Sequence, residues 1–373
     1  MRVLYFTDNN SDHNRRFLEK LATSGHEIFY LSLAGRPNPS YWLPRGIRLV
    51  ECDTTFPRHS SPLMMKPFVP ELKRVIEEVK PDLIHAGAIQ SCAYLAALSG
   101  FHPMLAMSWG SDLLVDSDRD HEWKKATSIA LQGADGFFCD CETVLRKART
   151  FSSFPDESVV MFPWGIQKGV FRPDGQKMPG VAESGNFVFI CTRSWEPIYG
   201  IDTLLKAFTL MLKEDENVRL LLIGHGSKEA DVRDYIERND LVEHVIVPGT
   251  VLGGEMPRYF RSASTYVSCA ESDGTSISLL EGMATGLPVV VADNASNREW
   301  VIEGKNGFLA EIGSAESFAE KMLRSIRLSA EQRAAMAELN QDTVAERADW
   351  DRNFPQLLRA YDKLIGRSIS AKQ

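Results

Sequence analysis

The stretch of this chain with the most chemical potential is "DGTSISLLEGMATGLPVVVAD", which runs from Asp273 to Asp293. It places one carboxylate directly before a Gly-Thr-Ser turn, and a second, Glu281, inside the short apolar helix that follows. Thr275 or Ser276 can cap that helix, so its first N–H groups and its dipole would favour an anion such as a phosphate. Two carboxylates beside an anion site suit the hydroxyl groups on either side of a diphosphate, with a sugar at one end and a ribose at the other.

The same residues have an interpretation that needs no ligand. Asp273 could form an Asx turn, while Ser278 and Glu281 could form a capping box at the start of the helix. The spacing alone does not separate the two interpretations.

The elements that must position these residues follow a regular alternation along the chain. Short apolar runs rich in β-branched and aromatic residues are separated by longer segments of helical period, which predicts crossover units and parallel sheets. A first set of apolar runs lies at 2–6, 27–32, 47–51, 82–85, 104–107, 136–139 and 159–162, and a second set lies at 187–192, 219–224, 245–249, 265–269 and 288–293. The tail from about residue 330 is expected to be helical.

The two sets are separated by "PWGIQKGVFRPDGQKMPGVAESG" at 163–185, which is dense in Pro and Gly and has no hydrophobic period, so it predicts a linker. A length of 373 residues also fits two domains. We therefore predict an α/β protein with two doubly wound parallel sheets. Ligands of such sheets bind beyond the carboxyl ends of the strands, which here would surround a cleft.

Composition excludes several classes of function. A net charge of -8 argues against a nucleic-acid partner. No apolar run approaches the roughly 18 residues of a spanning helix. The N-terminal "MRVLYFTDNNSDHNRRF" has the pattern of a first strand and not of a signal peptide, so a cytoplasmic protein is expected. The segment 63–80 sets Met and Phe beside Lys, which fits either ordinary packing or a peripheral contact with the inner membrane face.

The stretch "SDGTSISLLEGMATGLPVVVAD", followed by "NREWVIEGKNGFL", resembles the signature of the retaining GT-B glycosyltransferases of family GT4. That signature has a Glu, seven residues, a second Glu and then Ala-Met-Ala-x-Gly-x-Pro-Val-Val. Further agreeing segments are "GHEI" at 25–28, "PDLIHAG" at 81–87, "WGSD" at 109–112, "PWGIQKGVFRPD" at 163–174, "TRSWEPIYGIDTLLKAF" at 192–208, "IGHGS" at 223–227 and "WDRNFPQLLRAYDKL" at 350–364.

The resemblance implies the GT-B fold, with two Rossmann-like domains facing a cleft. Residues 1–165 would form the acceptor domain and residues 166–349 the domain that binds the nucleotide-sugar donor. The C-terminal helix at 350–373 would pack back on the N-terminal domain.

The resemblance also implies roles for individual residues. Glu281 would hold the nucleotide ribose, and the backbone of Ser276 and Ile277 would meet the diphosphate. Asp273, where the family usually has Glu, would contact hydroxyls of the donor sugar, and Arg193 would pair with the diphosphate. The segment from Gly249 to Val251 would present backbone groups to the base, and His85, ending "DLIH", would face the sugar or the acceptor.

The resulting candidate catalytic residues are Arg193, Asp273 and His85. The candidate donor-binding residues are Arg193, Gly249, Val251, Asp273, Gly274, Thr275, Ser276, Ile277 and Glu281.

Besides Asp273, the sequence departs from the family pattern in two places that would lie near the donor phosphates. The lysine that normally follows the family arginine is absent, because Tyr199 stands directly before Gly200. Lys228 and Arg298 are candidates to replace its charge. The first-strand loop has Asn9 and Asn10 where relatives commonly carry two glycines, and asparagine tolerates left-handed backbone angles.

Together these features predict a retaining glycosyltransferase that moves a sugar from a nucleotide-diphosphate sugar, preferably a UDP-sugar, to a hydroxyl of a small-molecule or lipid-linked glycan acceptor, as in cell-surface polysaccharide or glycoconjugate synthesis. No cofactor and no metal are expected, because an arginine and a helix N-terminus stand where a metal would need carboxylates. The alternatives are a sugar-nucleotide epimerase or hydrolase of the same fold and a catalytically silent subunit that binds a nucleotide sugar.

Overall fold

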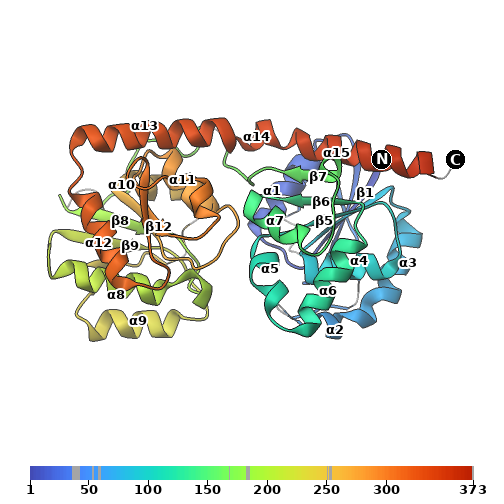
Figure 1. Cartoon of the computed structure of the whole chain (residues 1–373), viewed down its shortest axis with the longest axis horizontal. Coiled ribbons are helices and arrows are strands. Elements are labelled where there is room, and N and C mark those ends of the chain that lie inside the picture. The colour runs from blue at the N-terminus through green and yellow to red at the C-terminus, as the bar shows by residue number, and fades with distance from the viewer. Residues whose placement is uncertain are drawn as a thin grey trace. The chain divides into compact units, whose positions relative to one another are not determined.

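The structure is a computed structural model that describes residues 1–35, 43–52, 54–57, 60–167, 169–181, 185–249, 251 and 254–371, with side chains up to 366. The chain forms two compact units (Figure 1). The first contains Met1–Phe162 together with the segment from Arg352 onward, and the second contains Pro163–Asp351.

The first unit is built on a seven-stranded parallel sheet of order β3-β2-β1-β4-β5-β6-β7. Its strands are β1 (Arg2–Thr7), β2 (Glu27–Ser32), β3 (Ile47–Leu49), β4 (Leu83–Gly87), β5 (Met104–Met107), β6 (Gly136–Cys139) and β7 (Val159–Met161). Its helices are α1 (Asp12–Leu21), α2 (Pro62–Met65), α3 (Val69–Val79), α4 (Tyr94–Ser99), α5 (Ser111–Leu114), α6 (His121–Gln132), α7 (Glu142–Arg149) and α15 (Pro355–Ala371), and α14 (Trp350–Asn353) lies at the division between the units.

Both faces of this sheet are covered, which is why its central strands are continuous apolar runs. Leu4 and Phe6 of β1 pack into the core that α3, α4, α6 and α7 complete. Tyr5 points to the other face, where its ring meets that of Phe17 from α1. Tyr361 of α15 is fully buried on this face as well.

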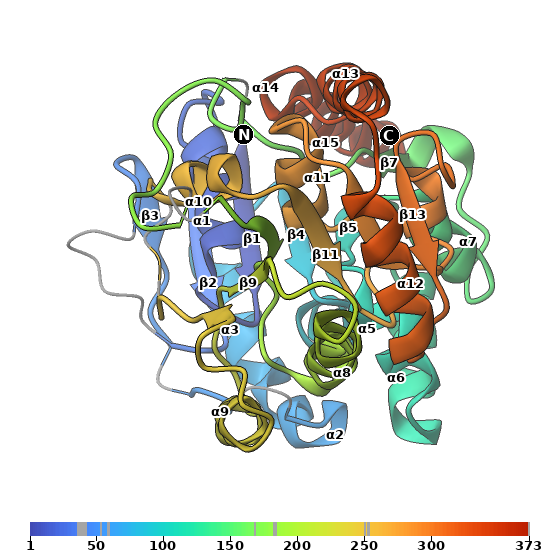
Figure 2. The same cartoon turned by 90° about the vertical axis from the view of Figure 1, so that its left-hand side faces the viewer.

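The second unit is built on a six-stranded sheet of order β10-β9-β8-β11-β12-β13, again with parallel pairs. Its strands are β8 (Phe187–Cys191), β9 (Val218–Leu222), β10 (Val245–Ile246), β11 (Thr265–Ser268), β12 (Val289–Ala292) and β13 (Gly307–Ala310). Its helices are α8 (Ile201–Leu212), α9 (Glu229–Arg238), α10 (Met256–Ser262), α11 (Ile277–Ala284), α12 (Ala315–Ile326) and α13 (Ala330–Arg347). One face packs on α8, α9 and α12, and the other packs on α10 and α11; Figure 2 shows α12 beside β13.

The observed strands confirm the expected α/β class with two parallel sheets, and most begin and end within two residues of the predicted runs. Strand β13 was not predicted. Its first residue is Gly307, where a Cβ atom would lie 2.6 Å from the carbonyl oxygen of Val289. The close approach of β12 therefore requires a glycine, which interrupts the apolar pattern that normally reveals a strand.

Two further expectations differ from the structure. The described part of the 163–185 segment belongs to the second unit, where Trp164, Ile166 and Val181 are buried; positions 168 and 182–184 lie outside the described residues. Single apolar residues among Pro and Gly have no period, so the sequence did not reveal this packing. Strand β4 also continues to Gly87, so His85 is in its middle and not at its carboxyl end.

The strand order of each sheet reverses once, between β1 and β4 in the first unit and between β8 and β11 in the second. At such a point the loops that follow the two neighbouring strands diverge to opposite faces, which leaves room for a ligand. In the second unit these two loops carry Arg193 and Asp273.

Candidate functional site

The two loops at the reversal point of the second sheet are fastened to each other. The N–H of Glu271 donates to the carbonyl of Ile198 at 3.0 Å. Gly200 has a positive φ of 62°, and a Cβ atom there would lie 2.4 Å from the carbonyl oxygen of Cys269. Only glycine fits this conformation and this space, so Gly200 holds the loop after β8 against the loop after β11.

Arg193 is the centre of the site. One terminal nitrogen, Nη2, lies 2.7 Å from Oδ2 of Asp273, and the other, Nη1, donates to the hydroxyls of Ser276 at 2.7 Å and Ser278 at 3.3 Å. Its Nε is buried and has no hydrogen-bond partner among the described residues. The structure therefore brings three side chains, from the loop after β11 and the start of α11, around the single guanidinium that the loop after β8 carries.

The ion pair between Arg193 and Asp273 is shielded from water, because the two side chains are only 10% and 19% exposed. The ring of Tyr199 covers the guanidinium at 4.2 Å, a cation–π contact. Burial is the largest single effect on the pKa of Arg193 and lowers it, but Asp273, together with Tyr266, Tyr199 and Cys191, outweighs burial, so the net pKa is raised. Arg193 is therefore a fixed positive charge at this edge of the sheet.

Helix α11 presents its N-terminus at the same place. Ser276 is its N-cap and accepts a hydrogen bond from the N–H of Leu279 at 3.4 Å. The capping box of Ser278 and Glu281, which was the interpretation without a ligand, is therefore not the cap that forms. Thr275 and Gly274 are buried just before the cap.

Only two positions of α11, Ile277 and Glu281, are partly exposed, and the other six are buried. They are four residues apart and so lie on one face of the helix, one turn from each other. Glu281 also follows Ser278 by three residues, which places it on the side of the helix where Ser278 contacts Arg193. The Glu281 carboxylate, the N-terminus of α11 and Arg193 thus lie together at the edge of the second sheet where its strands end.

Two contributors to this site were not predicted from the sequence. Ser278 joins Arg193 to the hydroxyl of Tyr266, which lies 2.8 Å from the Ser278 hydroxyl. Burial raises the pKa of Tyr266 to about 12, so it remains a neutral hydrogen-bonding group. The sequence signal for Ser278 was its position two residues after Ser276, but we had assigned Ser278 to helix capping.

His85 lies in the first unit and is fully buried in β4. Its Nδ1 is 2.6 Å from the hydroxyl of Tyr361, and its ring packs against those of Tyr5, Phe138 and Phe17. Burial lowers the pKa of His85 to about 3. These contacts describe a neutral core histidine, and its catalytic assignment stays a prediction.

The segment expected near the base follows β10, the edge strand of the second sheet. Gly249 has a positive φ of 78° with open space where a Cβ atom would lie, and Val251 is partly exposed. Position 250 lies outside the described residues. One strand, β9, lies between β10, which this segment follows, and β8, which Arg193 follows.

The candidates for the missing lysine both have partners. Lys228 pairs with Asp231 at 2.8 Å, and the Nε and Nη2 of Arg298 lie 2.5 and 2.7 Å from the oxygens of Asp293. The ring of Tyr199 stands where the lysine was expected and contacts Arg193 instead.

Asn9 and Asn10 do not adopt the left-handed angles that we expected for them, because neither has a positive φ. Their side chains are fixed locally instead. Asn9 accepts from the N–H of Ser11, and Asn10 accepts from the hydroxyl of Tyr30 at 2.8 Å. No group of three or more His, Cys, Asp or Glu side chains suited to a metal ion is found in the described part of the chain. None of the described helices combines the length and the apolar character needed to cross a bilayer.

Solved structures define the class of this fold. The chain superposes on sucrose-phosphate synthase from Thermosynechococcus elongatus with a TM-score of 0.81 at 16% identity, covering 98% of this chain and 100% of that one. It superposes on HepE of Anabaena, in complex with UDP and glucose, with a TM-score of 0.78 at 18% identity and the same coverage. The fold is therefore GT-B.

Sequence comparison places the chain within that class. Residues 176–342 match the family "Glycosyl transferases group 1", and residues 2–140 match "Glycosyl transferase 4-like". The GDP-mannose-dependent alpha-(1-6)-phosphatidylinositol monomannoside mannosyltransferase of Mycobacterium tuberculosis is 24% identical over 316 residues, which are 79% of this chain and 80% of that protein. These matches together support a GT4-like group 1 glycosyltransferase, and the class of reaction that they support is glycosyl transfer.

Proposed function

We propose that the protein transfers a sugar from a nucleotide-diphosphate sugar to a hydroxyl acceptor with retention of the anomeric configuration and without a metal ion. The observation that carries this proposal is the shielded guanidinium of Arg193 at the N-terminus of α11. A fixed cation beside free helix N–H groups suits a diphosphate whose negative charge grows as the bond to the sugar breaks.

The residues of this site fit successive parts of one donor molecule. Arg193 and the N-terminus of α11, at Ser276 and Ile277, would hold the diphosphate. Glu281 would accept hydrogen bonds from the ribose hydroxyls, and Asp273 from hydroxyls of the donor sugar. The assignment of Gly249 and Val251 to the base is part of the same proposal.

Retention follows from a front-face reaction. The bond between the anomeric carbon and the diphosphate oxygen breaks, and the acceptor oxygen forms its bond to that carbon on the same face. The departing diphosphate, neutralised by Arg193, takes the proton of the acceptor hydroxyl. Such a reaction asks the protein for positioning and leaving-group electrostatics and not for a separate base.

The choice of donor is open to direct test. We propose a UDP-sugar, since the HepE structure holds UDP with glucose, and GDP-mannose is the competing donor because the mycobacterial relative is named for it. The same relative is named for a phosphatidylinositol acceptor, which supports a lipid-linked glycan as acceptor. Leu63 and Met64 of α2 are 62% and 63% exposed, which is consistent with a cytoplasmic protein that touches the inner membrane face.

The experiment is a turnover assay with a panel of UDP-, GDP- and ADP-sugars and glycan acceptors. The quantity measured is the release of free nucleotide. Release with product formation is expected for one donor, whereas binding without release would indicate the silent subunit. The coupling constant of the anomeric proton, measured by NMR on the product of an α-linked donor, should be that of an α-linkage. A β-linked product would refute retention. Activity that disappears in EDTA and returns with magnesium or manganese would refute metal independence.

A further inference from the structure

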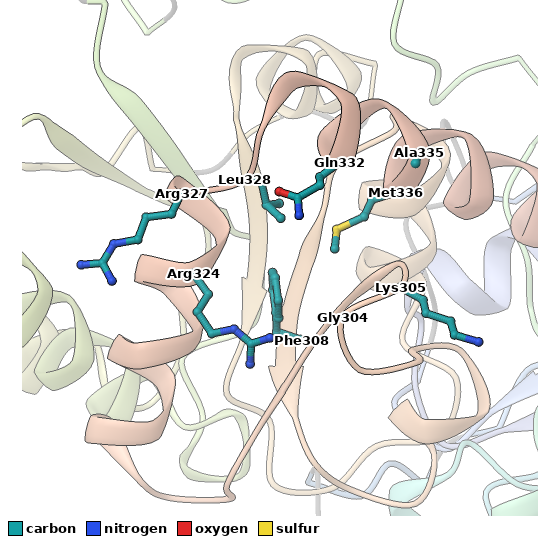
Figure 3. Close-up of a pocket in the computed structure, with 9 residues that line it drawn as sticks. All are labelled: Gly304, Lys305, Phe308, Arg324, Arg327, Leu328, Gln332, Ala335 and Met336. Atoms are coloured by element: carbon teal, nitrogen blue, oxygen red, sulfur yellow. The ribbon is translucent and has the colours of Figure 1, made fainter.

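A pocket of about 370 Å³ lies in the second unit, apart from the Arg193 site (Figure 3). It forms where the loop before β13, the end of α12 and the start of α13 meet. Its lining residues are Gly304, Lys305, Phe308, Arg324, Arg327, Leu328, Gln332, Ala335 and Met336. A pocket of this volume is large enough to hold a small organic molecule.

The pocket and the Arg193 site lie at opposite edges of the sheet. Gly304 and Lys305 precede β13, and Phe308 is its second residue, so the pocket is at the edge where the parallel strands begin. Arg193 lies two residues after the end of β8, at the edge where the strands end. A ligand in the pocket would therefore not occupy the proposed nucleotide-sugar site.

The rim of the pocket is cationic. The guanidinium of Arg324 lies 4.7 Å from the ring centre of Phe308 and pairs with Glu303 at 2.8 Å, a carboxylate that it shares with Lys321. The side chains of Lys305 and Arg327 are in no ion pair with any described residue. Two of the three cations at the rim are thus uncompensated, which favours an anionic ligand.

The interior of the pocket is apolar. Phe308 and Met336 are only 2% and 4% exposed, so they form a closed floor. Figure 3 shows Leu328, Gln332 and Met336 pointing toward the same space as Phe308, while Arg327 and Lys305 extend outward on opposite sides.

Helix α13 begins beside this space and adds the positive end of its dipole, although part of that end is already used. Ser329 and Gln332 form a capping box there, and Glu331 accepts a hydrogen bond from the hydroxyl of Ser329. Glu331 is not among the residues that line the pocket.

We propose that this pocket binds a small organic phosphate that carries an apolar group. The phosphate would lie at the rim beside Arg324, and the exposed side chain of Arg327 would turn inward to hold it, since guanidinium forks match the geometry of a phosphate. The apolar group would cover Phe308 and Met336. Neither half of such a ligand alone would satisfy both parts of the pocket.

The test uses phenyl phosphate as the probe, with inorganic phosphate and phenol as its two separate halves. Binding is followed on the whole chain through the ¹³C-methyl signal of Met336, with UDP present in excess to occupy the proposed nucleotide site. We expect a saturable shift with phenyl phosphate and a much weaker one with either half. No shift at Met336, or an equal shift with inorganic phosphate, would overturn the proposal.

Two variants in the pocket and one outside it make the test specific. Arg327→Gln removes one uncompensated, exposed cation and should weaken phenyl phosphate binding about tenfold, the usual effect of one charge-assisted hydrogen bond. Ala335→Phe fills the pocket without altering its charge and should abolish the shift. The control Arg238→Gln changes an exposed arginine at the end of α9 and should bind like the wild type. Unaltered affinity in both pocket variants would refute the site.

The phosphate could come from a free metabolite or from a lipid headgroup, and vesicles separate the two. Co-sedimentation with phosphatidylcholine vesicles that contain phosphatidic acid, lost in both Arg327→Gln and Ala335→Phe, would assign the lipid. Phenyl phosphate binding without co-sedimentation would assign the soluble ester.

Discussion

The buried histidine of the first unit should make folding of the protein sensitive to acid. His85 is fully buried, and burial lowers its pKa from 6.5 to about 3. In the unfolded chain the imidazole binds a proton below about pH 6.5, whereas in the folded chain it does not until about pH 3. The stabilisation is therefore complete above pH 6.5 and is lost as the pH falls toward 3.

The two pKa values set the size of the effect. Relative to pH 7.5, His85 alone should lower the free energy of unfolding by about 2 kcal/mol at pH 5 and by about 3 kcal/mol at pH 4. Asp112 acts in the opposite direction, because burial raises its pKa to about 6 and acidification therefore stabilises its folded state. The quantity to compare is thus the difference between variants and not the total dependence on pH.

The perturbation is His85→Gln, which removes the titrating group, and the control is His121→Gln, which alters an exposed histidine at the start of α6. Urea unfolding is measured at pH 7.5, 5 and 4 by tryptophan fluorescence, since Trp109 packs on Phe17 in the same aromatic cluster. The variant should lose less stability than the wild type on acidification, by the amounts given above, and the control should follow the wild type. Equal losses in all three proteins would refute the reasoning. A pH profile of activity that requires deprotonation of His85 near pH 6 would also refute the reasoning, because the folded protein should hold this histidine neutral down to about pH 3.

The remaining predictions concern the donor site. Glu281→Gln should weaken nucleotide binding ten- to a hundredfold, because a charge-assisted contact with the ribose contributes about 1.5–3 kcal/mol. Asp273→Asn should leave the affinity for free nucleotide nearly unchanged. Both affinities are measured by calorimetry, and an unchanged affinity in Glu281→Gln would refute the ribose assignment. Arg193→Ala should reduce turnover more than ground-state affinity, because charge on the leaving group develops mainly in the transition state, and steady-state kinetics showing equal losses in both would mean uniform binding. Tyr199→Phe keeps the ring over the Arg193 guanidinium and should retain activity. Tyr199→Leu removes a cation–π contact of roughly 1 kcal/mol and should reduce turnover about fivefold. Similar rates for the two variants would show that the ring does not position Arg193.

Much of the fold could be predicted because its information is local. Parallel strands covered on both faces must be apolar along their whole length, so β1 and β12 are visible as runs of letters. The N-terminus of α11 was visible for the same reason, since a serine before an apolar helix has few other roles. Strand β13 was missed because the requirement for Gly307 comes from a neighbouring strand far away in the sequence.

The donor site was predicted in part. Asp273 and Arg193 were both named, but as separate contacts to one ligand, and nothing in the sequence showed that they pair with each other across 80 positions. Ser278 was assigned to capping because, within its own helix, that is the only task its spacing suggests. Tyr199 was noted only as the absence of a lysine, and its place over the guanidinium depends on the loop that Gly200 holds against Cys269.

The sequence by itself determined the repeated strand-helix rhythm, the two sheets and the segment that carries the carboxylates and the helix start, because each depends on residues close together in the chain. Only the tertiary structure decided what the polar side chains do. The reversal of strand order between β8 and β11 brings Arg193 to Asp273, Ser276 and Ser278, whereas His85, at what was expected to be the end of a strand, lies in the middle of one and is buried among aromatic rings. Charge and pKa depend on such distant neighbours and on burial, and both are properties of the packed structure.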